Sequence, residues 1–303
     1  MNITNIEELK VPRKIQIETT NHCNSKCNFC PHHVMKRKAE FMSDKLFTRL
    51  INEIIDIPEV KVLEMSGFGE PLLDRHRVFE AIKKVKEKRP DIFTLFYTNG
   101  ALLTAETAHI PADKITISFN GGTKEAYETT MGTVKFEDAL RSVKLFLDER
   151  QKHPEILKRI NVYILMITTK YNALTASQFQ ELWKGYTNVT TGLCQSRDWL
   201  GQYKKSHLLL PYDKIQYTHG VCHRLKYLAE IWSNGDLALC CHDYDNKHPF
   251  SSVIDSSLID VWSAPKRMKI VGDALKCKYT IPLCQHCNLK IDEDPANWPV
   301  PVK

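Results

Sequence analysis

Short apolar runs alternate with amphipathic segments from residue 14 to about residue 193. The apolar runs have the length of strands and are rich in β-branched and aromatic residues, which is typical of parallel strands covered on both faces. They occupy residues 14–18, 60–66, 93–98, 114–119, 161–167 and 188–193. The segments between them have apolar residues at helical spacing and predict helices at 43–57, 75–89, 123–130, 135–150 and 175–186.

Repeated strand–helix units predict an α/β fold with a parallel sheet, as an open barrel or a wound sheet. After about residue 200 the pattern changes to short strands, turns and cysteines, and Asn234-Gly235 is a hairpin-turn signal between two apolar runs. We therefore expect two domains, residues 1–205 and 206–303.

Composition narrows the class of protein. Hydrophobic residues make up 43% and charged residues 26% of the chain, as in globular proteins. The net charge of +6 is mild, and the charged run at 83–89 is interpreted as a solvated helix face, so no nucleic-acid partner is expected. Apolar runs stay far below the ~20 residues that span a bilayer, and the first fourteen residues lack a signal-peptide core. We expect a cytoplasmic protein without a membrane partner.

Ten cysteines in a reducing compartment need a reason other than disulfides. Cys23, Cys27 and Cys30 follow the first expected strand, whereas Cys194 stands alone. The other six fall in the last third of the chain, at Cys222, Cys240, Cys241, Cys277, Cys284 and Cys287. Two separate thiol clusters indicate two metal or iron–sulfur sites, and buried apolar cysteines are the structural alternative.

The first cluster has the spacing Cys23-x3-Cys27-x2-Cys30, without a fourth cysteine nearby. Three thiolates hold three corners of a cubane iron–sulfur cluster and leave the fourth iron open for a ligand. Farther along, Gly67 and Gly69 allow close approach of the backbone to a ligand, and Glu70 supplies negative charge for an ammonium group.

This motif, with Phe29 before the last cysteine, resembles the radical S-adenosylmethionine (radical SAM) superfamily. Three further segments follow in the order of that family. Residues 67–71 (GFGEP) are similar to its glycine-rich element, 97–100 (YTNG) to its third-strand motif, and 118–121 (SFNG) to its fourth-strand motif, where Asn120 replaces the usual acid. The resemblance covers roughly residues 13–200.

The resemblance implies a partial (β/α)6 barrel of the TIM type and a 4Fe–4S cluster on Cys23, Cys27 and Cys30. It implies that electrons from a reducing partner such as flavodoxin or ferredoxin cleave SAM to a 5′-deoxyadenosyl radical. The implied SAM-binding residues are Phe29, Gly67, Phe68, Gly69, Glu70, Asn99, Ser118 and Asn120.

The second thiol cluster, Cys222-x12-Gly235-x4-Cys240 followed by Cys284-x2-Cys287, resembles the auxiliary-cluster extension called SPASM or its shortened relative, twitch. The final Cys-x5-Cys-x3-Cys element of a full SPASM domain is absent, which favours twitch. The resemblance implies a second 4Fe–4S cluster, held by Cys222, Cys240, Cys284 and Cys287. Cys277 could replace one of these four residues, and a zinc site is the structural alternative.

The spacing is similar to that of family members that oxidise an aminocyclitol. We expect dehydrogenation of a small polar, carbohydrate-like or aminocyclitol-like substrate, with the auxiliary cluster as electron acceptor. The main alternative is an epimerase in which a cysteine thiol returns a hydrogen atom, with Cys194 and Cys241 as candidate donors and Cys277 as a further one. A peptide maturase and a non-catalytic iron–sulfur or zinc protein are the remaining alternatives.

Overall fold

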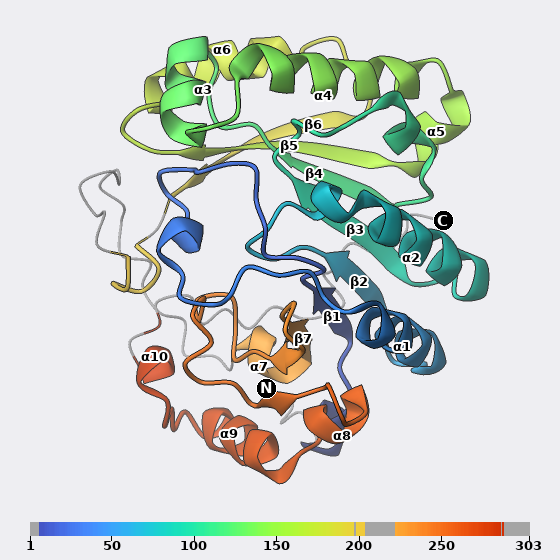
Figure 1. The fold of residues 1–303 in the computed structure, drawn as a ribbon, viewed down its shortest axis with the longest axis vertical. Helices are drawn as coiled ribbons and strands as arrows, with labels where there is room; N and C mark the ends of the chain where they lie inside the picture. Colours follow the sequence, from blue (N-terminus) through green and yellow to red (C-terminus); the bar gives the residue numbers. More distant parts are fainter. Residues whose placement is uncertain (1–5, 197, 204–221, 286, 288–303) are drawn as a thin grey trace.

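A parallel sheet forms the centre of the computed structural model, which describes residues 6–196, 198–203, 222–285 and 287 (Figure 1). Its strands follow the order β6-β5-β4-β3-β2-β1-β7-β8-β9. All neighbours from β1 to β6 pair in parallel, which confirms the predicted α/β fold. These strands are β1 (Lys14–Ile17), β2 (Val62–Met65), β3 (Phe93–Thr98), β4 (Lys114–Ser118), β5 (Asn161–Thr168) and β6 (Val189–Gln195).

Helices α1 to α6 cover the outer face of this sheet (Figure 1). Most agree with the predicted ranges, and Ser43 caps α1 by accepting a hydrogen bond from the Leu46 N–H at 3.3 Å. Two differences appear. The last predicted helix ends at Leu182, before a turn at Gly185 with φ +93°, and the unexpected helix α5 begins at Pro154, a residue favoured in the first turn. The helices are α1 (Asp44–Asp56), α2 (Arg75–Lys88), α3 (Lys124–Met131), α4 (Phe136–Gln151), α5 (Pro154–Arg159) and α6 (Ala176–Leu182).

Short 3₁₀ helices lie in the connections. They are η1 (Ile6–Lys10), η2 (Pro31–Val34), η3 (Pro71–Asp74), η4 (Ala105–His109) and η5 (Ala173–Thr175).

The C-terminal part of the chain extends the same sheet. β7 (Leu228–Ile231) pairs in parallel with β1 on the side opposite to β2. The predicted hairpin is confirmed, because β8 (Asp236–Leu237) pairs antiparallel with β7 across a turn in which Gly235 has φ +83°. The remaining elements are α7 (His223–Tyr227), β9 (Ser251–Ser252), α8 (Leu258–Trp262), α9 (Pro265–Leu275) and α10 (Pro282–Gln285). The expected domain boundary at residue 205 lies outside the described residues.

The two faces of the sheet differ in polarity. Side chains on the outer face, such as Ile15, Leu63 and Ile115, are fully buried against the helices. The inner face carries polar groups at the same level, because the register places Gln16 beside both Glu64 on β2 and Glu230 on β7. The inner face is therefore suited to a polar ligand rather than to an apolar core.

None of the helices in the described part of the chain has the length and apolar character needed to cross a membrane.

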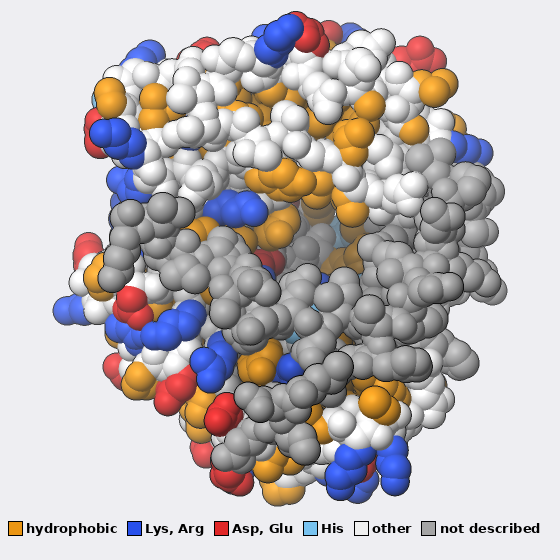
Figure 2. All heavy atoms as spheres, turned by 180° about the vertical axis from the view of Figure 1, so that it is seen from behind, with side chains coloured by type: hydrophobic (Ala, Val, Ile, Leu, Met, Phe, Trp, Pro, Cys, Tyr) orange, Lys and Arg blue, Asp and Glu red, His pale blue; other side chains and the backbone are white. Residues whose placement is uncertain are grey.

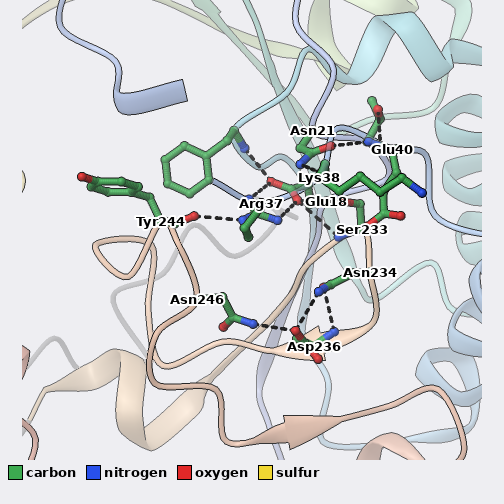
Figure 3. A network of polar contacts seen from close by, with 12 residues as sticks. Glu18, Asn21, Arg37, Lys38, Glu40, Ser233, Asn234, Asp236, Tyr244 and Asn246 are labelled. Carbon is green, nitrogen blue, oxygen red and sulfur yellow. Dashed lines mark hydrogen bonds and ion pairs between the residues drawn. The ribbon is translucent and has the colours of Figure 1, made fainter. Parts of the chain in front are cut away.

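Glu18, the residue after β1, connects three segments that are far apart in the sequence (Figure 3). Its carboxylate accepts two hydrogen bonds from the Arg37 guanidinium, at 2.7 and 3.0 Å, and one from the Phe68 N–H at 2.9 Å. It also accepts from the N–H and the hydroxyl of Ser233, at 3.2 and 3.1 Å. The Glu18 side chain has 0% and that of Arg37 7% of its surface exposed, so this ion pair is buried.

The surrounding contacts extend this connection. The Asn21 side chain donates to the Lys38 carbonyl at 2.8 Å and accepts from the Glu40 N–H at 2.7 Å, which closes the loop after β1 on itself. On the hairpin, Asn234 and Asn246 both donate to one carboxylate oxygen of Asp236 (Figure 3). The loop after β1, the loop after β2 and the β7–β8 turn are therefore held as one unit.

Replacing Glu18 by glutamine keeps the size of the side chain but leaves the Arg37 charge buried and unpaired. We expect the free energy of unfolding to fall by about 3–5 kcal/mol, measured by denaturant titration. Asp138→Asn is a matched control, because Asp138 pairs with Arg141 on the exposed surface, where a pair contributes about 0–1 kcal/mol. Equal losses in the two variants would contradict the structural role of Glu18.

Candidate functional site

The first three cysteines line a large cavity at the carboxyl ends of the parallel strands. Cys23, Cys27 and Cys30 lie in the loop after β1 and face a space of about 1190 Å³ that protein atoms leave unfilled, part of it open to solvent. Seen from behind, the molecule is hollowed near its centre, with hydrophobic side chains along the upper border of the hollow (Figure 2). The structure brings all the expected SAM-binding residues to this one cavity: Phe29, Gly67, Phe68, Gly69, Glu70, Asn99, Ser118 and Asn120.

The loop that carries these cysteines is fixed by the end of α3. The Lys26 and Asn28 N–H groups donate to the carbonyls of Met131 and Thr130, at 3.1 and 2.9 Å. The Ser25 hydroxyl donates to the Met131 carbonyl at 2.7 Å and lies 3.1 Å from the Cys27 sulfur. The cysteines are thereby held in position by backbone contacts to a distant part of the chain.

Burial raises the pKa values of these three thiols. It raises the pKa of Cys23 to about 12 and that of Cys27 to about 11, and it raises the pKa of Cys30 further. Neighbouring thiols add to the rise, because a second thiolate nearby would be a like charge. A bound cation reverses this balance, since metal binding deprotonates its cysteine ligands. This donor set therefore fits an iron–sulfur cluster.

The spacing of the sulfurs also bears on the zinc alternative. Tetrahedral zinc with Zn–S bonds of ~2.3 Å needs sulfurs about 3.8 Å apart. Within the described residues, only one group of three His, Cys, Asp or Glu side chains has ligand atoms all within 4.8 Å of one another, and it contains no cysteine. The sulfurs of Cys23, Cys27 and Cys30 are therefore not all within 4.8 Å of one another in this structure, which contains no metal.

The glycine-rich loop after β2 packs against the end of β1. A Cβ atom on Gly69 would lie 2.2 Å from the Thr20 carbonyl oxygen, and one on Gly67 would lie 2.4 Å from the Glu18 side chain. The glycines are therefore needed for close packing within the chain, a reason that the sequence pattern did not reveal.

Glu70 is buried and held by three donors. Its carboxylate accepts from the Leu72 N–H at 3.0 Å, the Thr98 hydroxyl at 2.8 Å and the Asn99 N–H at 2.7 Å. Burial raises its pKa to about 7, against the effect of these hydrogen bonds. Glu70 also caps η3, so the carboxylate joins two strand ends at the wall of the cavity.

The two asparagines of the strand-end motifs are similarly fixed. The Asn99 side chain donates to Asn24 Oδ1 at 2.6 Å, beside the cysteine loop. Asn120 is fully buried, accepts from the Ile167 N–H at 2.7 Å and directs its amide nitrogen to the Met131 sulfur at 3.1 Å. An amide at position 120 both donates and accepts a hydrogen bond, whereas a carboxylate would only accept and would place a negative charge in this buried position.

A second, smaller cavity brings the C-terminal cysteines together. About 460 Å³ of space unfilled by protein atoms is lined by Cys222, Cys240, Cys284 and Cys287, together with apolar side chains such as Leu225 and Leu239. These are the four residues expected to hold the auxiliary cluster. Cys277 is exposed and does not line this cavity.

Cys240 and Cys241 are neighbours in the chain but line different cavities. Cys240 lines the smaller cavity, whereas Cys241 lines the larger one. Burial raises the pKa of Cys241 to about 12, so the side chain is a protonated thiol at neutral pH. Cys194, the other candidate donor, is exposed at the end of β6 and lines neither cavity.

Charged residues of the larger cavity were missed by the sequence analysis. Glu64 lies in the wall and pairs with Lys14 at 2.5 Å; burial would raise its pKa, but the Lys14 charge lowers it below the usual value. Arg224 lines both cavities and pairs with Glu230 at 2.6 Å. A signal was present, because Glu64 and Glu230 each interrupt a short apolar strand.

Comparisons with known proteins agree with this geometry. The chain matches the family model of the radical SAM superfamily over residues 17–172 and that of SPASM, an iron–sulfur cluster-binding domain, over residues 222–288. The tungsten-containing aldehyde ferredoxin oxidoreductase cofactor-modifying protein of Pyrococcus furiosus is 22% identical over 91% of this chain and 87% of its own length. The S-adenosyl-L-methionine-dependent 2-deoxy-scyllo-inosamine dehydrogenase of Niallia circulans is 30% identical over 30% of this chain and 36% of its own length.

Among solved structures, that of BtrN in complex with AdoMet and 2-DOIA superposes with a TM-score of 0.57 at 16% identity, covering 88% of each chain. At this identity the likeness concerns the fold. The family match implies SAM and a 4Fe–4S cluster in the core and further iron–sulfur ligation in the C-terminal part. This chain belongs to the radical SAM superfamily and carries a C-terminal SPASM iron–sulfur cluster-binding domain.

Proposed function

We propose that this protein is a radical SAM dehydrogenase that oxidises a carbinol carbon of a small polar substrate. The observation that carries the proposal is the shared wall of the two thiol-lined cavities, formed by Arg224 and the Cys240–Cys241 pair. An electron that leaves a substrate in the larger cavity needs to cross only this wall to reach the four-cysteine cavity.

Two sets of cysteines have different roles in this proposal. Cys23, Cys27 and Cys30 hold the catalytic cluster, and Cys222, Cys240, Cys284 and Cys287 hold a closed auxiliary cluster, as in a twitch-type extension. When bound, the catalytic cluster and SAM supply the radical that removes a hydrogen atom, and the auxiliary cluster supplies an electron acceptor. The carbinol group becomes a ketone by losing the hydrogen atom of its carbon to the radical, the proton of its hydroxyl group to solvent and one electron to the auxiliary cluster.

The lining of the larger cavity supports a substrate that carries several polar groups. Gln16, Glu64 and Arg224 present an amide, a carboxylate and a guanidinium to the same space. Gln16 donates to the Ser66 carbonyl, and Glu64 and Arg224 pair with Lys14 and Glu230. An amide, a carboxylate and a guanidinium each offer more donors or acceptors than one partner uses, so hydroxyl and amino groups on a ligand are fitting additional partners. A carbohydrate-like or aminocyclitol-like substrate meets this requirement, and the names of the Niallia circulans relative and of the BtrN complex are consistent with it.

A reducing environment and a reducing partner complete the proposal. The ten cysteines all lie in the described part of the chain and form no disulfide there, as expected of a cytoplasmic protein. A flavodoxin or ferredoxin is the expected electron donor. We also propose the division into residues 1–205, which hold SAM, and residues 206–303, which hold the auxiliary cluster.

Cys241 supports a second candidate function, that of an epimerase. Its protonated thiol lines the same cavity as the expected SAM-binding residues. A thiol in this place is able to return a hydrogen atom to a substrate radical, which would invert the carbon instead of oxidising it. Cys194 and Cys277 are exposed and lie outside both cavities, so Cys241 is the donor in this alternative.

Replacing Cys23, Cys27 or Cys30 with alanine is expected to abolish cleavage of SAM, because each residue supplies a cluster ligand. The measurement is formation of 5′-deoxyadenosine by anaerobically reconstituted protein in the presence of SAM and dithionite. Cys277→Ala, a change of the same kind at an exposed position, is expected to retain formation. Continued formation by a protein without Cys23, Cys27 and Cys30 would refute the assignment of the SAM site.

Metal analysis tests the two-cluster assignment. After treatment with EDTA, which removes metal ions from surface sites, the protein is expected to contain about eight iron atoms per chain and little zinc. Cys240→Ala is expected to lower the iron content by up to about four atoms, whereas the adjacent change Cys241→Ala leaves it near the wild-type value, because the two side chains line different cavities. About four irons plus one zinc would rule out the electron-acceptor role, since zinc is not redox-active.

Heavy water distinguishes dehydrogenation from epimerisation, with 2-deoxy-scyllo-inosamine as the probe substrate. A dehydrogenase gives a ketone without solvent deuterium at the reacting carbon, and Cys241→Ala changes the rate only modestly. An epimerase incorporates one deuterium per turnover at the inverted carbon, and Cys241→Ala stops product formation while hydrogen abstraction continues. Cys194→Ala serves as the control thiol. Mass spectrometry of the product decides between the two.

A further inference from the structure

A group of metal-ligand side chains lies on the outer surface of the molecule, where helix α4 ends. His109 is the last residue of η4, Glu149 lies in the last turn of α4, and His153 precedes α5. None of the three lines either thiol cavity. Across the described ranges, this is the one set of three His, Cys, Asp or Glu side chains with its ligand atoms all within 4.8 Å of one another.

The two histidine nitrogens both lie close to one oxygen of the Glu149 carboxylate. His109 Nε2 lies 3.0 Å and His153 Nε2 lies 3.2 Å from the same oxygen, Glu149 Oε1. Metal bonds of about 2.0–2.2 Å to nitrogen and oxygen place tetrahedral ligand atoms about 3.3–3.5 Å apart. An increase of a few tenths of an ångström in these two nitrogen–oxygen distances would therefore give the spacing of ligand atoms around a bound ion.

The charged side chains of Lys152 and Glu155 orient Glu149 and His153 as metal ligands. Lys152 holds the other carboxylate oxygen, Glu149 Oε2, at 3.0 Å, which leaves Oε1 directed at the two imidazoles. Glu149 supplies the carboxylate of the group, and its side chain is half-buried between the two histidines. His153 Nδ1 lies 3.4 Å from Glu155, the kind of outer carboxylate contact that orients metal-bound histidines.

We propose that His109, Glu149 and His153 bind one divalent transition-metal ion at the surface, with Zn²⁺ as the best-matched ion. Two imidazoles and one carboxylate are ligands that Zn²⁺ prefers, and they suit magnesium or calcium less well. His109 is exposed and His153 is half-buried, so one position of the ion would be accessible to water. The ion would connect η4 to the α4–α5 junction. This proposal is independent of the radical chemistry.

Isothermal titration with Zn²⁺ tests the proposal on anaerobic protein that carries its iron–sulfur clusters, with iron content measured before and after. The wild type is expected to bind one zinc ion in addition to its cluster metals. His109→Asn, His153→Asn and Glu149→Gln are each expected to weaken that binding at least tenfold. His76→Asn, a change at an exposed histidine on α2, is expected to leave it unchanged.

Three results would overturn the proposal. One is equal zinc affinity in the wild type and in the three ligand variants. Another is the absence of additional binding below about 1 mM zinc. The third is loss of the binding event in a Cys194→Ser or Cys277→Ser protein, which would assign it to an exposed thiol. Because the substituted side chains are at the surface, circular dichroism spectra of the variants are expected to match that of the wild type.

Discussion

A buried carboxylate, that of Glu18, is the contact on which the arrangement of the whole site depends. It receives hydrogen bonds from Arg37 on the cysteine loop, from Phe68 on the glycine-rich loop and from Ser233 on the β7–β8 turn. A buried charge is stable only when it is paired and hydrogen-bonded. The Glu18 carboxylate therefore requires that the three segments pack together around it. The Arg37 guanidinium also lies 4.8 Å from the Trp232 ring centre, which adds an aromatic contact to the same point.

This constraint has a chemical consequence, because it fixes the C-terminal extension relative to strands β1 to β6 of the sheet. β7 continues the parallel sheet beside β1, and the Cys240–Cys241 pair follows the β8 strand of its hairpin. The pair lies at a turn, in which the Asp243 N–H donates to the Cys240 carbonyl at 2.9 Å. Cys240 lines the smaller cavity and Cys241 lines the larger one, with Arg224 in the wall of both.

The two faces of the sheet differ in polarity, as a sheet with a functional inner face requires. Outward side chains such as Ile15 and Leu63 are buried against the helices and stabilise the fold. The side chains at the next positions, Gln16 and Glu64, point inward and line the larger cavity. They contribute less to apolar packing than the outward side chains do, but they place polar groups at the cavity. Lys14 compensates the buried charge of Glu64, as it must for a carboxylate removed from water.

The sequence alone determined where the parallel strands and most of the helices lie along the chain and how the cysteines group, because periodicity and short motif spacings are local properties of a chain. The order of the strands in the sheet came from the tertiary structure. The sequence did not reveal that Glu64 and Glu230 lie at one level beside Gln16, since strand register depends on pairing between distant segments. Nor did it separate Cys241 from Cys194 and Cys277. Only the tertiary structure decided which of these thiols faces the cavity, because burial and direction depend on packing around a residue rather than on its neighbours in sequence.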